Sequence, residues 1–196
     1  MGIERAMAPL IGGVGLLERA ITYTLGSLHI VTPEGLSNPT PCRDWDLRAL
    51  LRHMNDSLLA LQEAIDIGRV DLDCACGDGG PDADPVAVVR DRACLLLGAW
   101  TNASDPQVVS IAGVSVATGI VTGAGALEVA VHGWDVAQAC GRPRPMPPPL
   151  AEELLPMAAL VVTDADRPAR FAAPRDLPPA AGPAGLLLAF LGRRPD

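Results

Sequence analysis

The sequence contains no lysine, and all 15 of its basic residues are arginine. Against 23 acidic residues these give a formal net charge of −8. An acidic chain without a basic cluster is poorly suited to bind nucleic acid or an anionic membrane surface as its main partner. Aromatic residues are also scarce, at 3%, but 49% of the chain is apolar, which excludes a wholly disordered protein. Its 196 residues suffice for one domain with a core and are few for two.

Two uncharged stretches raise the question of export or membrane insertion. Residues 6–17 have the length of a signal-peptide core but lack a basic flank and a small-residue cleavage site. Residues 106–127 could span a bilayer by length, but serine, threonine and glycine interrupt them. We therefore expect a cytoplasmic protein with no transmembrane helix.

The five cysteines are odd in number and irregularly spaced, which favours reduced thiols over a disulfide framework. Cys74 and Cys76 lie in a loop rich in aspartate and glycine and could form a metal or redox pair. Two free thiols are the simpler interpretation, because no second cysteine pair completes a metal site.

Apolar residues recur at steps of three and four in five segments, which predicts helices. The segments are residues 10–29, 46–68, 85–100, 125–139 and 150–163. The second is the most clearly amphipathic, with Asp46 as its N-cap and an end near Gly68. Asp84 and Pro85 similarly mark the start of the third, and Gly141 marks the end of the fourth.

Between the third and fourth helices, residues 108–121 are rich in β-branched side chains, which predicts a short hairpin or an extended crossover. The expected fold is thus mainly α: a four-helix bundle with a short β insertion. We expect residues 1–165 to form the bundle and residues 166–196 to form a short C-terminal extension that packs on it.

The fourth predicted helix carries the most informative polar residues of the chain. At about 100° per residue, Glu128, His132 and Asp135 lie within about 60° of one another. The rest of the helix is apolar, so this stripe should be buried or line a cavity. Buried carboxylates and imidazoles are costly unless they are paired or bind a metal. Glu128 and His132, four residues apart, could ligate one ion.

A third ligand has to come from another helix, and the sequence offers only two further histidines. His53 lies about 110° from the centre of the leucine stripe of its helix, at the edge of the core. His29 lies beside a proline- and glycine-containing loop and is the weaker candidate. We therefore predict a metal site formed by His53, Glu128 and His132. A boundary histidine at 53 and a Glu128–arginine pair are the competing interpretations.

Asp135 follows His132 by one turn and is the predicted catalytic residue. It could accept the second ring N–H of His132 and fix its tautomer, or act as a base. The alternative is that Asp135 pairs with an N–H group or an arginine elsewhere in the chain. Arg52, Arg167 and Arg170 are candidates to attract an anionic substrate, although a solvated surface position is the favoured interpretation for each, so they are not included in the predicted site.

Two sequence segments resemble a known family. The first runs from Thr40 through Pro-Cys-Arg-Asp-Trp-Asp to His53, and the second is Glu128-Val-Ala-Val-His132-Gly-Trp-Asp135. Both are similar to motifs of the mycothiol-dependent maleylpyruvate isomerase N-terminal family, within the DinB-like metal-binding superfamily. The Gly-Arg-Arg-Pro ending at residues 192–195 also resembles actinobacterial members.

This resemblance implies a DinB-like bundle in an up-down-down-up arrangement, with a divalent ion, usually zinc, held by His53, Glu128 and His132. It implies a thiol-dependent isomerase or S-transferase that uses mycothiol and a small electrophilic substrate. DinB-like bundles commonly pair, which suggests a homodimer. The characterised isomerase has an additional C-terminal domain, whereas this chain has only a short tail after residue 165. A metal-dependent hydrolase and a non-catalytic binding protein are the alternatives.

Overall fold

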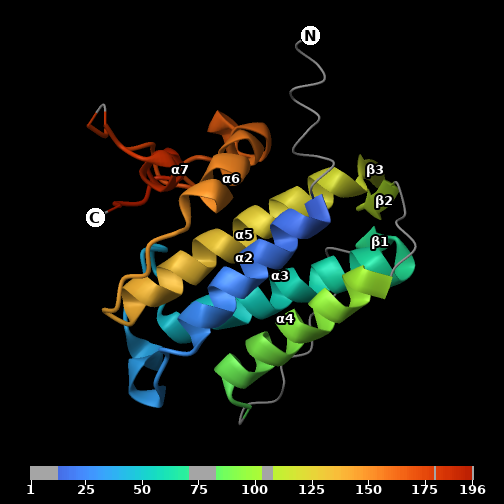
Figure 1. The fold of residues 1–196 in the computed structure, drawn as a ribbon, viewed down its shortest axis with the longest axis horizontal. Helices are drawn as coiled ribbons and strands as arrows, with labels where there is room; N and C mark the ends of the chain where they lie inside the picture. Colours follow the sequence, from blue (N-terminus) through green and yellow to red (C-terminus); the bar gives the residue numbers. More distant parts are fainter. Residues whose placement is uncertain (1–12, 71–82, 103–107, 179, 196) are drawn as a thin grey trace.

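The computed structural model describes residues 13–70, 83–102, 108–178 and 180–195. Four long helices form a bundle, shown in Figure 1. They are α2 (Gly13–Leu28), α3 (Leu47–Ile67), α4 (Pro85–Asn102) and α5 (Thr118–Ala139). Helix α2 packs against α5 and α4, and α3 packs against α4 and α5. In Figure 1, α2 and α5 run in one direction and α3 and α4 in the other. The prediction of a mainly helical bundle in the up-down-down-up arrangement is confirmed.

The ends of α3 follow from its sequence as predicted. The Asp46 carboxylate accepts a hydrogen bond of 2.8 Å from the backbone N–H of Ala49. Gly68 ends the helix in the left-handed conformation, with φ of 64°. Between these caps, leucines and a methionine bury one face of the helix. This arrangement fixes the rotation of α3 in the bundle, and with it the direction of His53.

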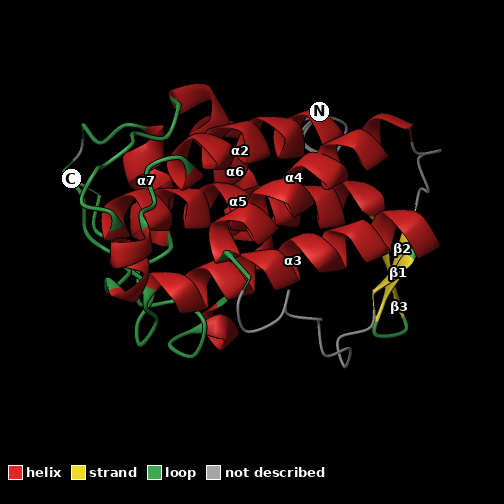
Figure 2. Ribbon diagram, turned by 90° about the horizontal axis from the view of Figure 1, so that it is seen from below, coloured by secondary structure: helices red, strands yellow, loops and turns green. Residues whose placement is uncertain are grey.

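A three-stranded sheet lies at one end of the bundle, and the loops of the C-terminal region lie at the other (Figure 2). Strand β1 (Arg69–Val70) continues from α3 and pairs in parallel with β2 (Val108–Ile111). Strand β2 pairs antiparallel with β3 (Val114–Ala117) through a turn at Ala112 and Gly113, both with positive φ. The predicted hairpin is therefore present, and β1 is a further strand that was not predicted.

The predicted boundary between the hairpin and the fourth helix is wrong. Helix α5 begins at Thr118, whereas the β-branched residues favoured extended structure as far as Val121. Close packing explains the difference. A Cβ atom placed on Gly123 would lie 2.3 Å from Met157 Cε, and one on Gly125 would lie 2.6 Å from Leu61 Cδ2. These tertiary contacts outweigh local β propensity.

The chain after α5 forms two further helices. Helix α6 (Pro148–Val161) packs on α5, and α7 (Pro183–Phe190) packs on α6. Helix α6 corresponds to the fifth predicted helix, whereas α7 has no counterpart among the predicted helices. Arg167 links the segment after α6 to the end of α7, because its Nη2 donates a 2.8 Å hydrogen bond to the carbonyl of Phe190, the last residue of α7. None of the described helices is long and apolar enough to cross a membrane.

Helices α2 and α5 approach closely at Gly133, where the Thr24 hydroxyl donates a buried 2.8 Å hydrogen bond to the Val129 carbonyl. A Cβ at Gly133 would lie 2.3 Å from Thr24 Oγ1 and 3.1 Å from Thr24 Cα. We expect Gly133→Ala to lower the free energy of unfolding by about 1–3 kcal/mol, because the helices must move apart. Urea denaturation measures the change.

Gly98→Ala is the matched control, because a Cβ there would meet no atom within 4 Å. It is expected to leave stability unchanged or to raise it by up to about 1 kcal/mol through helix propensity. Equal stabilities of the two variants would contradict the close approach of α2 and α5.

Tyr23, the only tyrosine, joins α2 to the linker before α6. Its hydroxyl donates to the Arg144 carbonyl at 2.8 Å. Burial raises the pKa of Tyr23 to about 12, although the charge of Arg144 opposes the shift. The folded chain thus keeps a phenolic proton that the unfolded chain releases near pH 10, so stability should fall as the pH rises from 10 to 12. The expected loss is about 2–3 kcal/mol.

Denaturation at several alkaline pH values measures this loss, and tyrosinate absorbance follows Tyr23 itself. The absence of lysine leaves few other groups that titrate in this range. Tyr23→Phe should show a flatter profile above pH 10, and an equally steep profile in that variant would rule out Tyr23 as its source.

Candidate metal centre

The polar stripe predicted on α5 is present on a helix that is otherwise apolar and mostly buried. Asp135 is fully buried, with 0% of its surface exposed, and His132 is 7% exposed. Glu128 is more accessible, with 32% of its side chain exposed. The stripe therefore runs from the interior toward solvent, so a ligand could reach only its Glu128 end.

His53 projects from α3 to meet this stripe. Its Nε2 lies 2.5 Å from Glu128 Oε1, and His132 Nε2 lies 3.1 Å from the same oxygen. One ligand atom from each of the three residues lies within 4.8 Å of the other two. The structure thus brings together the three residues predicted as metal ligands. His29 lies apart, and its Nδ1 is hydrogen-bonded to the Leu25 carbonyl at 2.7 Å.

The loop before α3 closes one side of this group. Its ends are joined by the 2.9 Å bond from Leu47 N–H to the Asn38 carbonyl, and Asn38 also donates to the Ala139 carbonyl at the end of α5. The loop places the Trp45 ring 4.8 Å from the His53 ring and 6.4 Å from the His132 ring, centroid to centroid. An indole wall therefore limits the directions in which both imidazoles can turn.

The contacts of His132 indicate which of its nitrogens is available. Its Nδ1 lies 2.9 Å from Asp135 Oδ2, so this nitrogen carries a proton and donates it. The lone pair of Nε2 then faces the carboxylate of Glu128. Two electron-rich atoms 3.1 Å apart need a cation between them, which is either a proton or a metal ion.

A proton on Nε2 of His132 can take this place. Burial alone would lower the pKa of His132, but the charge of Glu128 and the hydrogen bond to Asp135 outweigh it, so the pKa lies well above the usual value. Burial would likewise raise the pKa of Glu128, yet the charge and hydrogen bonds of His132 and His53 hold it well below its usual value. The carboxylate is therefore charged. Two imidazoles and a carboxylate form a donor set that fits a divalent ion such as zinc.

Asp135 is held from its other side by Arg193, which reaches it from the C-terminal tail. Arg193 Nη2 lies 2.6 Å from Asp135 Oδ2, and its Nε lies 3.0 Å from Oδ1. Burial would raise the pKa of Asp135, but the charge of Arg193 and the hydrogen bond from His132 lower it to about 2. This buried, weakly basic carboxylate is suited to orient His132, the first of its two predicted roles, and poorly suited to act as a base.

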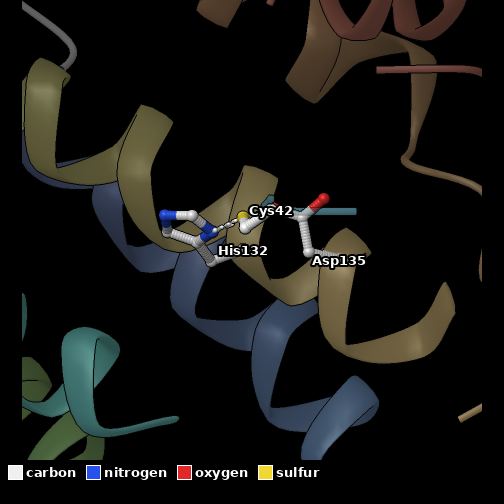
Figure 3. A group of neighbouring side chains, drawn as sticks. All are labelled: Cys42, His132 and Asp135. Atoms are coloured by element: carbon white, nitrogen blue, oxygen red, sulfur yellow. Dashed lines mark hydrogen bonds and ion pairs between the residues drawn. The ribbon is translucent and has the colours of Figure 1, made fainter. Parts of the chain in front are cut away.

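Cys42 completes this inner cluster. Its Sγ lies 3.4 Å from Asp135 Oδ2 and 3.8 Å from His132 Nδ1, and Figure 3 shows the three side chains converging. These residues could form a second group of metal ligands. However, the Arg193 guanidinium is 3.7 Å from the same sulfur and already supplies the positive charge. The set of His53, Glu128 and His132 is therefore the better cation site.

Sequence reasoning missed Arg193 and Cys42 as contributors to the centre. It favoured other arginines, which the structure places elsewhere. Arg167 is hydrogen-bonded to the end of α7. The side chain of Arg170 is 79% exposed and forms an ion pair of 3.7 Å with Asp166. Arg52 is exposed on α3. Cys74 and Cys76 lie outside the described residues. Cys42 and Arg193 do lie within the segments that resembled the family, which was the available signal.

An up-down-down-up helical bundle with two histidines and a glutamate converging from α3 and α5 defines a DinB-like fold. Residues 17–137 match the mycothiol maleylpyruvate isomerase N-terminal domain, and the chain belongs to this family. The family assignment points to a metal-binding, mycothiol-related protein. No curated protein matches the chain. No solved structure matches it either.

Proposed function

We propose that the chain is a metal-dependent enzyme that activates a low-molecular-weight thiol, such as mycothiol, for isomerisation of or S-transfer to a small electrophilic substrate. The observation that carries this proposal is the convergence of His53 Nε2, His132 Nε2 and Glu128 Oε1 on one point. His53 and Glu128 are 36% and 32% exposed in their side chains, so the group has one accessible side. Three protein ligands with an open side are typical of catalytic rather than structural zinc sites.

Each residue of the centre has a separate role in this proposal. His53, Glu128 and His132 would hold the ion, and when bound it supplies a Lewis acid beside which a thiol loses its proton near neutral pH. Asp135 keeps the proton of His132 on Nδ1, and Arg193 keeps Asp135 ionised. Ser57 donates to Glu128 Oε1 at 3.2 Å and orients that carboxylate. Trp45, whose ring centroid lies 4.8 Å from that of His53, offers an apolar surface against which a substrate could lie.

The chemistry that follows depends on the substrate. Addition of the thiol sulfur to one carbon of an activated cis double bond leaves a single bond that can rotate. Expulsion of the same sulfur then gives the trans isomer and returns the thiol unchanged. With a substrate that carries a leaving group, the sulfur–carbon bond forms as the bond from that carbon to the leaving group breaks. The leaving group departs with the electron pair of the broken bond, and the thiol proton is released to solvent.

The test is turnover of maleylpyruvate, and of a thiol-reactive bimane, by zinc-loaded protein with and without mycothiol. We expect product formation faster than the uncatalysed thiol reaction only when protein, zinc and thiol are all present, with mass spectrometry identifying a trans isomer or a thioether. Glu128→Gln should reduce turnover to background, and His29→Ala should not change it, since His29 lies outside the centre.

Other outcomes would overturn the proposal. Turnover without thiol would favour a hydrolase that uses water at the same centre. Zinc binding without any thiol-dependent product would favour a non-catalytic binding protein.

A further inference from the structure

A second feature of the molecule lies outside the metal centre: a cavity of about 420 Å³ between the end of α5, the linker before α6, and α7. Trp134 forms the α5 wall, residues 143–146 form the linker wall, and Leu177, Leu188 and Pro195 come from the C-terminal region. The volume falls within the range of about 300–1,000 Å³ that small-molecule sites occupy.

The walls are mostly apolar, and Gln138 and Arg144 are the two polar side chains in them. Proline, leucine, alanine and glycine make up most of the lining, and Arg144 is the only charged residue in it. An apolar cavity with a single charged group is typical of a site that binds an apolar molecule and fixes its orientation at one polar end.

Arg144 lacks a counter-ion among the described residues. Its guanidinium lies over the Tyr23 ring, with Cζ 5.9 Å from the centroid, and against Gly26, where a Cβ would be 2.9 Å from Cζ. Its Nε atom is buried without a hydrogen-bond partner. A buried donor that carries positive charge and lacks an acceptor is costly, and an anionic ligand would satisfy it.

We propose that this cavity binds a small carboxylate with an apolar body. The carboxylate would pair with the Arg144 guanidinium, whose planar donors match its two oxygens. The apolar body would lie among the leucines and prolines of the linker and α7. A neutral amide of the same shape offers one carbonyl oxygen to the guanidinium but no negative charge, and so would bind more weakly.

The cavity is independent of the proposed metal centre. On α5, Trp134 lies about 160° around the helix from His132, so the two features occupy opposite faces. Apart from Trp134, every lining residue follows residue 137, where the match to the family ends. A ligand here would therefore be a property of the C-terminal part of this chain, and failure of the thiol chemistry would leave the proposal untouched.

The test is calorimetric titration of the full chain with 2-naphthoate and with its neutral counterpart, 2-naphthamide. We expect naphthoate to bind at least about tenfold more tightly, since a hydrogen-bonded ion pair contributes that much. Arg144→Gln should weaken naphthoate binding by about tenfold and change naphthamide binding much less. The Tyr23 hydrogen bond survives in this variant, because the backbone carbonyl of Arg144 accepts it.

Two further variants make the test decisive. Arg142→Gln removes an exposed arginine two residues away and should bind naphthoate as the wild type does. Gly185→Leu should abolish binding of both compounds by filling the cavity, since a Cβ there meets only ordinary contacts with Ala181 and Leu177. No binding of naphthoate to the wild-type chain, or equal binding by Arg144→Gln or Gly185→Leu, would overturn the proposal. If Arg144→Gln does not fold, Gly185→Leu and the naphthamide comparison decide.

Discussion

His132→Ala is expected to release zinc from the protein almost completely. His132 is buried, and Asp135 fixes its ring so that Nε2 faces Glu128. The variant keeps only His53 and Glu128, fewer than the three protein ligands usual for catalytic zinc. The loss of affinity should exceed the roughly 10- to 100-fold cost of replacing a residue that only supports a ligand.

Competition with a chromophoric chelator gives the zinc affinity of the variant, and elemental analysis gives its stoichiometry. His29→Ala is the matched control, because it removes an exposed imidazole that is hydrogen-bonded within α2 and the turn after it. One equivalent of tightly held zinc in His132→Ala would remove this residue from the site. Equal loss in both variants would point to a non-specific effect of histidine content.

Asp135→Asn and Arg193→Met are each expected to destabilise the fold by about 3–5 kcal/mol, because each leaves one partner of a buried ion pair uncompensated. The two side chains are 0% and 9% exposed, with 2.6 Å between Oδ2 and Nη2, so solvent screens the pair little. The double variant should lose less stability than the sum of the single variants, because neither charge is then left buried alone. Urea denaturation of all four proteins completes the cycle.

The same variants report on the role of Asp135 toward His132. If Asp135 orients the imidazole, Asp135→Asn should bind zinc about 10- to 100-fold more weakly than the wild type. Arg194→Met is the control for Arg193→Met, because Arg194 is adjacent to Arg193 in the sequence but its side chain is exposed. Strictly additive losses of stability in the double variant would show that Asp135 and Arg193 do not act as a pair.

The ligand set could be predicted because it follows from local rules. Helical spacing places Glu128 and His132 on one face, and the caps at Asp46 and Gly68 set where α3 begins and ends. With only three histidines in the chain, few candidates remained for the ligand from another helix. Whether these residues bind a metal stays a prediction until zinc binding is measured.

The rest of the centre depends on contacts that sequence spacing does not encode. Arg193 lies 58 positions from Asp135, and Cys42 lies 90 positions from His132. The tail reaches α5 because Gly192 turns with φ of 79°, where a Cβ would lie 2.8 Å from the Ala172 carbonyl oxygen. The early start of α5 also depends on contacts between helices. The close packing of Gly123 and Gly125 against α6 and α3 outweighs the β propensity of the local sequence.

One consequence concerns the thermodynamic linkage between ion occupancy and folding. His53 and Glu128 are 75 positions apart and meet only when α3 and α5 are assembled, so the denatured ensemble offers no equivalent chelate. By mass action, free zinc at about 100 times its dissociation constant would add about 2.7 kcal/mol to the native state. The melting temperature of this chain should therefore rise with the concentration of the free ion, and starvation for that ion would shorten the lifetime of the protein.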